Sequence, residues 1–237
     1  MAEALTQQNS VDWLKESIRE IDWDDIETVR RLSYPLLKGL GDDPVWLGRL
    51  LASAIENPAL RPMFEHYDIL DKIVLYDDEE TGARLRLHIF LPGYFDRPHD
   101  HRWAYTTYIL SGEYEHYSYI PKDFTDRDQI DAMLPSMVST ERSGSSYTYD
   151  STLFHSIVAA PFTVSLILRG PAAKSQFLVV DRIEKTSWWQ FGARDEDGAS
   201  QDQKRMDDTR LTECLGVLQS LSLVTLPRAA AEFDERG

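Results

Sequence analysis

The stretch PGYFDRPHDHRWAYTTYILSG, residues 92–112, contains two histidines, His99 and His101, that are separated by one residue. Side chains on an extended strand alternate between its two faces, so this pair would point both imidazoles to the same side. Such a pair can chelate a metal ion, or it can be two unrelated polar residues at the end of a strand. The surrounding sequence separates these possibilities.

Residues 70–182 have the pattern of a β-rich domain. Short runs of β-branched and aromatic residues are separated by turn-forming residues, with little helix between them. In one of these runs, leucine and isoleucine alternate with Arg84, Arg86 and His88. Ser111–Gly112 lies between two strand patterns, where a hairpin turn is expected. The pattern predicts an antiparallel sandwich or barrel, and therefore a mainly β fold.

Helices are expected on both sides of this barrel. In residues 1–69, one helical pattern begins with Ser10 as N-cap, a second continues until Pro35, and a third begins at Asp43–Pro44. Residues 183–237 are polar at first and then contain one helical pattern, TRLTECLGVLQSLSL. The chain is therefore predicted to consist of an N-terminal helical extension, the barrel and a C-terminal extension with one helix.

The composition excludes several classes of protein. The 237 residues carry a formal net charge of -15, which argues against a nucleic-acid partner. The single cysteine, Cys214, excludes internal disulfides and a cysteine-rich metal site. No apolar run is long enough to suggest a membrane span or a signal peptide, so a cytoplasmic protein is expected. The expected partners are a small molecule and dioxygen, and a homodimer is allowed.

The opening stretch resembles the first motif of the cupin family, which has a glycine, an HxH pair, a glutamate and a second glycine at fixed spacings. Gly93, His99, His101 and Gly112 stand at those spacings, and Tyr105 occupies the place of the glutamate. The resemblance implies a cupin double-stranded β-helix, also called a jelly-roll barrel, over roughly residues 85–182.

The second cupin motif is represented by GSSYTYDSTLFHSIVAAP. Gly144 and His155 keep the family spacing, whereas Asp150, Thr152 and Ala159 replace the usual proline, glycine and asparagine. The resemblance is therefore strong for the first motif and weak for the second.

The resemblance implies a metal site formed by His99, His101 and His155. Neutral imidazoles suit Fe, Zn, Cu or Ni, and three of them leave coordination positions open. Fe(II) is the expected metal, with Zn, Ni, Mn and Cu as alternatives. His66, in a segment expected to be helical, and His116 are expected to be structural. His88 can line the barrel.

The tyrosine in place of glutamate makes the ligand set neutral, which resembles the thiol dioxygenases. These cupins bind ferrous iron through three histidines and add dioxygen to a small thiol carboxylate. Tyr105 is the expected catalytic residue, as a hydrogen-bond donor or proton carrier. One departure concerns the Ser-His-Tyr relay that follows the third ligand in those enzymes, because His155 is the last histidine of this chain.

Three arginines are candidates for binding a substrate carboxylate, because a guanidinium pairs with a carboxylate bidentately. Arg169 lies 14 residues after His155, where 2-oxoglutarate-dependent oxygenases hold their cosubstrate. Arg84 and Arg86 lie on the strand leading into the first motif. The same arginines can equally pair with acidic residues of the protein.

The leading functional hypothesis is a non-haem Fe(II) oxygenase acting on a small carboxylate-bearing substrate. The alternatives are a 2-oxoglutarate-dependent oxygenase, a non-redox metal cupin such as an isomerase, lyase or hydrolase, and a non-catalytic small-molecule-binding barrel. The 2-oxoglutarate-dependent oxygenases usually have a carboxylate ligand at the position that His101 occupies here. Activity without 2-oxoglutarate is therefore expected.

Overall fold

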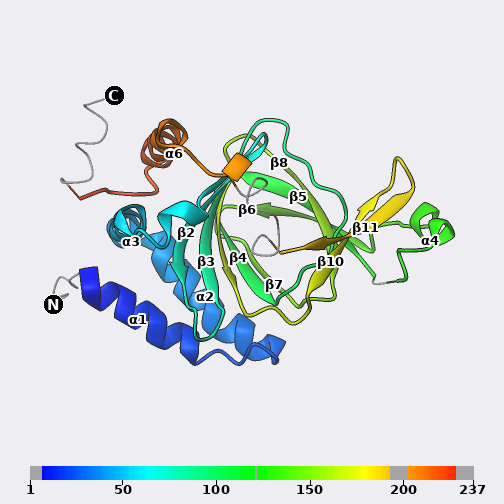
Figure 1. Ribbon diagram of the computed structural model, residues 1–237, viewed down its shortest axis with the longest axis horizontal. Helices are drawn as coiled ribbons and strands as arrows, with labels where there is room; N and C mark the ends of the chain where they lie inside the picture. Colours follow the sequence, from blue (N-terminus) through cyan, green and yellow to red (C-terminus); the bar gives the residue numbers. More distant parts are fainter. Residues whose placement is uncertain (1–6, 121, 193–201, 228–237) are drawn as a thin grey trace.

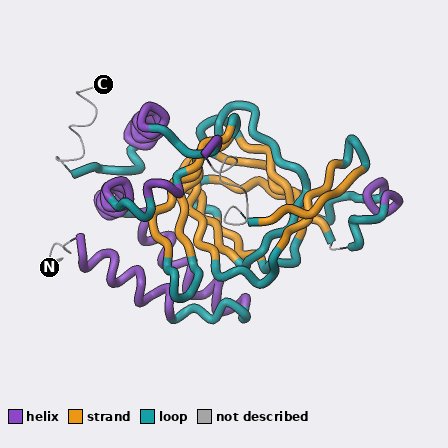
Figure 2. The backbone as a smooth tube through the Cα atoms, viewed as in Figure 1, coloured by secondary structure: helices purple, strands orange, loops and turns teal. Residues whose placement is uncertain are grey.

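A computed structural model describes residues 7–120, 122–192 and 202–227 of the chain (Figures 1 and 2). Its elements are α1 (Gln7–Arg19), α2 (Ile26–Asp42), α3 (Pro44–Glu56), η1 (Arg61–Met63), β1 (Glu65–Tyr67), β2 (Leu70–Asp77), β3 (Arg84–Phe90), β4 (Tyr105–Ser111), β5 (Glu113–Tyr119), α4 (Arg127–Asp131), β6 (Met137–Arg142), β7 (Ser146–Tyr149), β8 (Phe154–Ala159), β9 (Val164–Arg169), β10 (Gln176–Asp181), β11 (Thr186–Phe191) and α6 (Asp208–Ser220). The predicted mainly β fold with helices at both ends is confirmed.

Two antiparallel sheets face each other and form a jelly roll. One sheet has the order β1-β2-β3-β9-β4-β7. The other contains β6-β5-β8, and residues 95–99 extend it through bridges from Phe95 to Val158 and from His99 to His155. The four-strand orders β3-β9-β4-β7 and 95–99-β8-β5-β6 are those of two interleaved Greek keys, which define this fold.

Several local predictions were wrong. Ser111–Gly112 does not close a hairpin, because β4 and β5 belong to different sheets and the turn carries the chain across the barrel. The turn requires glycine, since Gly112 has φ +80° and a Cβ there would lie 2.4 Å from the Thr163 hydroxyl. The helical pattern does not stop at Pro35, which lies within α2. His66 lies in a strand, β1, instead of a helix.

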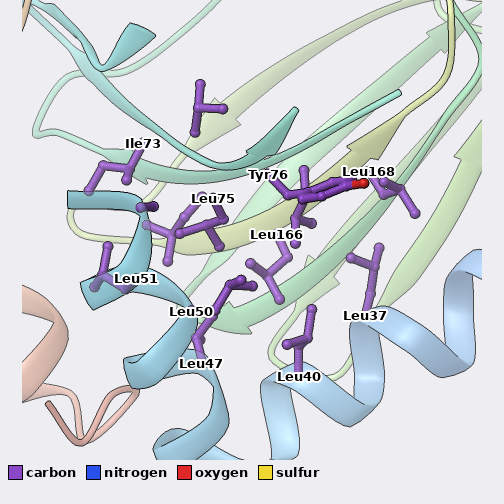
Figure 3. Packing of buried hydrophobic residues seen from close by; sticks show 14 of the residues in the cluster. Leu37, Leu40, Leu47, Leu50, Leu51, Ile73, Leu75, Tyr76, Leu166 and Leu168 are labelled. Atoms are coloured by element: carbon purple, nitrogen blue, oxygen red, sulfur yellow. The ribbon is translucent and has the colours of Figure 1, made fainter. Parts of the chain in front are cut away.

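The helical extensions cover the outer face of the larger sheet (Figure 1). Asp25 caps α2, and Asp43 with Pro44 begins α3 as expected. Figure 3 shows leucines of α2 and α3 packed against β2 and β9, and the same cluster includes residues of α6. None of the described helices has the length and apolarity needed to cross a bilayer.

The packing of the helices on the outer face of the larger sheet explains why apolar and polar side chains alternate along β3. Leu85, Leu87 and Ile89 are fully buried in the helix-facing core. The alternate residues Arg84 and Arg86, together with His88, therefore face the interior of the barrel. The larger sheet has an apolar outer face under the helices and an inner face that carries charged and polar groups.

An ion pair joins α6 to the larger sheet. The Asp71 carboxylate is fully buried and accepts hydrogen bonds from Arg210 at 2.6 Å and from His66 at 2.7 Å. The Arg210 side chain is partly exposed. Because a buried carboxylate is costly without a partner, this pair fixes where α6 docks.

Arg210→Ala is expected to destabilise the protein, because it removes the ion-pair partner of the buried Asp71 carboxylate. Breaking a buried pair costs about 3–5 kcal/mol, and we expect about 3 kcal/mol because Arg210 itself is partly exposed. Arg142→Ala is the control, since Arg142 and Glu113 form an exposed pair that contributes little. Urea unfolding followed by tryptophan fluorescence measures both. Equal effects would contradict the assignment.

Candidate metal centre

The HxH segment lies directly beside β8, which closes a gap of 54 residues in the sequence. His99 N–H donates to the His155 carbonyl, and His155 N–H donates to the His99 carbonyl, both at 2.9 Å. Asp100 points away from the site, and its carboxylate accepts from the Leu178 N–H at 2.8 Å and from Lys174. Strand pairing therefore places the first and third predicted ligands side by side, while Asp100 holds the segment against β10.

The three histidine side chains converge in the barrel interior. One nitrogen from each of His99, His101 and His155 lies within 4.8 Å of the others. The Nε2 atoms of His101 and His155 are 2.8 Å apart. His99 donates its Nδ1–H to the Arg97 carbonyl at 2.8 Å, which leaves its Nε2 as a lone-pair donor. The structure thus brings together all three predicted ligands.

The donor set fits a divalent transition metal. Burial lowers the pKa of His101 and of His155 well below the ordinary value, so both rings are neutral. The Nε2 atoms of His101 and His155 are 2.8 Å apart, so they can share one proton or bind one metal cation together. Metal–nitrogen bonds of about 2.0–2.1 Å give nitrogen–nitrogen separations of roughly 3 Å. The group contains neither a carboxylate nor a thiolate, so a bound ion would keep its full charge.

Tyr105 lies beside the histidine cluster. Its hydroxyl is 3.2 Å from His155 Nε2, and its ring contacts the His101 ring with centroids 4.6 Å apart. The side chain is almost fully buried, which raises the pKa of the phenol well above its ordinary value. Tyr105 therefore remains protonated and can donate a hydrogen bond.

The three candidate arginines share the inner face of the larger sheet but have different surroundings. Arg84 is buried and ion-paired with Asp77 at 2.6 Å. Arg169 donates from Nη1 to the carbonyls of Gly82 and Gly170, each at 2.8 Å. Arg86 has a buried Nε with no hydrogen-bond partner among the described residues.

Beside the histidines lies a cavity of about 150 Å³. Arg86, His88 and Ser165 line it, and each has a buried side-chain nitrogen or oxygen that lacks a partner within the described part of the chain. His88 and Ser165 are directly opposite each other on β3 and β9. Buried polar atoms without partners are uncommon in folded proteins, so these three form a wall suited to a polar ligand.

His116 is the residue that sequence reasoning missed. It was expected to be structural, yet its Nε2 lies 2.9 Å from Nδ1 of His155. Burial lowers the pKa of His116 to about 4. In the run EYEHYSY, residues 113–119, His116 alternates with exposed glutamates, and this period-two pattern could have placed it inside the barrel.

Fold and site together define a jelly-roll barrel with a three-histidine cluster in its interior. No protein-family model and no curated protein matches the sequence. The structure is similar to KdgF from Halomonas sp., with 14% identity and a TM-score of 0.36 over 46% of this chain and 86% of that chain. It is also similar to an RmlC-like cupin from Shewanella frigidimarina, with 17% identity and a TM-score of 0.35 over 47% and 85% of the two chains.

A third similar structure is the DMSP lyase DddQ from Ruegeria pomeroyi, with 13% identity and a TM-score of 0.35 over 46% of this chain and 51% of that chain. Each similarity covers less than half of the present chain. The jelly-roll assignment follows from the strand order itself.

His99→Ala, His101→Ala and His155→Ala are each expected to lower metal affinity sharply, because each removes one of three neutral donors. Loss of an outer partner of a ligand costs about 10–100-fold in metal affinity, so loss of a ligand should cost at least that much. His66→Ala is the control, since His66 bonds Asp71 away from the cluster. Elemental analysis after Zn(II) loading measures occupancy. Full occupancy in His155→Ala would remove it from the ligand set.

Proposed function

We propose that this protein is a metal-dependent cupin enzyme, a non-haem Fe(II) oxygenase that acts on a small carboxylate-bearing substrate. The single observation that carries the proposal is the convergence of three histidines, within 4.8 Å, beside a small cavity. His99, His101 and His155 would hold the metal. When bound, ferrous iron would supply open coordination positions and redox chemistry.

Tyr105 is the proposed catalytic residue. Its hydroxyl lies beside His155 Nε2, at the edge of the cavity, and it stays protonated. A ligand atom that developed negative charge at this position would accept a hydrogen bond from the phenol. Such a preorganised donor acts strongly in a buried site because no water competes with it.

Arg86 is the proposed carboxylate anchor. Arg84 and Arg169 also stand on the barrel wall, but the first is neutralised by Asp77 and the second holds two backbone carbonyls. The buried Nε of Arg86 has no hydrogen-bond partner among the described residues, and His88 and Ser165 each add one more such polar atom on the same wall. A substrate carboxylate would satisfy these groups, as a buried cation requires.

The neutral ligand set supports the thiol-dioxygenase-like form of the proposal. A divalent ion with three neutral ligands retains two positive charges, which favours an anionic substrate as a further ligand. A thiol carboxylate would provide both a thiolate for the metal and a carboxylate for Arg86. No 2-oxoglutarate is needed in this scheme.

The test is dioxygen uptake by protein loaded anaerobically with Fe(II) and then mixed with a panel of small carboxylates, including thiol carboxylates. We expect consumption with one member of the panel and no dependence on 2-oxoglutarate. Succinate release with 2-oxoglutarate would instead show the cosubstrate-dependent oxygenase. Turnover of a panel member without dioxygen uptake would show the non-redox alternative.

Tyr105→Phe supplies the matched variant in this assay, because it removes one hydroxyl and keeps the ring. We expect Fe(II) to remain bound while turnover falls on the order of 100-fold, the usual contribution of a positioned proton donor. Unchanged turnover in the folded variant would leave Tyr105 with a packing role only.

Arg86→Met is expected to keep or raise the stability of the ligand-free protein, because it removes a buried cation whose Nε has no hydrogen-bond partner among the described residues. Arg84→Met should lower stability, since it leaves the buried Asp77 without its ion pair. Thermal unfolding compares the two.

In the uptake assay, Arg86→Lys should raise KM by about one to two decades, because lysine loses the bidentate geometry. Wild-type KM in Arg86→Lys would exclude the anchor.

A further inference from the structure

A diagonal line of side chains crosses the smaller sheet and ends at the metal centre. His155 of β8 is directly opposite Ser118 of β5, so His116 is its diagonal neighbour on the same face. Glu141 of β6 stands in the corresponding diagonal relation to His116, since Ser139 is directly opposite His116. Diagonal neighbours in a sheet are about 7–8 Å apart, which long side chains can bridge.

The contacts along this line join a surface strand to a metal ligand. His116 Nε2 is 2.9 Å from His155 Nδ1, and His116 Nδ1 is 3.9 Å from a Glu141 carboxylate oxygen. The second separation is longer than a direct hydrogen bond but close enough for the carboxylate to attract an N–H. The Glu141 carboxylate also accepts a hydrogen bond from Ser139 at 2.8 Å, which fixes its position.

Metal coordination through Nε2 of His155 determines which ring nitrogen of His155, and which of His116, carries the proton. A neutral imidazole that gives its Nε2 lone pair to a metal carries its proton on Nδ1. That Nδ1–H must donate to His116 Nε2, so this nitrogen is bare and the proton of His116 is on Nδ1. The His116 N–H then faces the negative charge of Glu141, which favours this tautomer.

We propose that His116 and Glu141 are positioning residues that hold His155 in the tautomer and orientation required for metal binding. The inference rests on the proposed metal centre and deepens it. Hydrogen bonding from a coordinated imidazole to an outer acceptor raises the basicity of the ligand and restricts ring rotation. The His116 ring itself contacts the rings of Tyr147 and Tyr149, at centroid distances of 4.4 and 5.2 Å.

The first test observes the protons directly. Long-range proton–nitrogen spectra of the Zn(II)-loaded protein distinguish a protonated, a bare and a metal-bound imidazole nitrogen. We expect a proton on Nδ1 of both His155 and His116, zinc on Nε2 of His155, and a bare Nε2 on His116. A proton on Nε2 of His116 in the zinc-loaded protein would overturn the proposal.

The second test measures the affinity for Co(II) by competition with a chelator. His116→Leu removes the acceptor while keeping an apolar side chain of similar bulk, and we expect its Kd to rise about 10–100-fold. His116→Gln can still accept through its amide oxygen and should recover most of the affinity. Glu141→Gln should cause a smaller loss than His116→Leu, because it removes only the outer charge.

Metal binding by the wild type and by His116→Leu distinguishes an error in the positioning role of His116 from an error in the proposed metal centre. If the wild-type protein binds neither Zn(II) nor Co(II), the metal centre itself is wrong. If the wild type binds Co(II) and His116→Leu binds it equally well, only the positioning role fails. His66→Ala controls for the loss of a histidine elsewhere and should bind Co(II) as the wild type does. The tautomer measurement needs no variant, so it decides the question even if His116→Leu does not fold.

Discussion

The rest of the structure depends on the backbone pairing of His99 with His155. Two hydrogen bonds of 2.9 Å join these residues and insert the segment 95–99 as a strand between β8 and β10. Without this pairing, the smaller sheet would lack the strand that carries the HxH pair. The same two hydrogen bonds therefore close the barrel and assemble the histidine cluster.

The larger sheet reverses the usual arrangement of a β-sandwich, in which the faces between the sheets are apolar. Here the apolar face of β2, β3 and β9 lies under α2 and α3, as Figure 3 shows, and the inner face carries arginines and His88. The helices add a large hydrophobic core to the smaller cluster that Phe90, Ile109 and Ile157 form within the barrel. A 237-residue chain can thereby combine a large hydrophobic core with a polar cavity.

Burial affects the side chains at the two ends of the cavity in different ways. At the histidine cluster it keeps the His101 and His155 rings neutral and able to donate lone pairs. On the opposing sheet it leaves the Arg86 Nε without a hydrogen-bond partner among the described residues. A ligand with a donor atom at one end and a carboxylate at the other would satisfy both. This complementarity, together with the cavity volume of about 150 Å³, restricts the proposed substrate to a small molecule.

The sequence by itself determined the β-rich middle, the helical ends and the inward direction of His99 and His101, because these follow from local periodicity. The resemblance of two segments to the cupin motifs also implied His155 and Tyr105 as members of the site. The tertiary structure alone decided which of Arg84, Arg86 and Arg169 has a buried Nε without a hydrogen-bond partner among the described residues, since their contacts depend on how the strands and loops pack. It also decided that His116 touches His155, because strand register between β5 and β8 is a long-range property that no local pattern encodes.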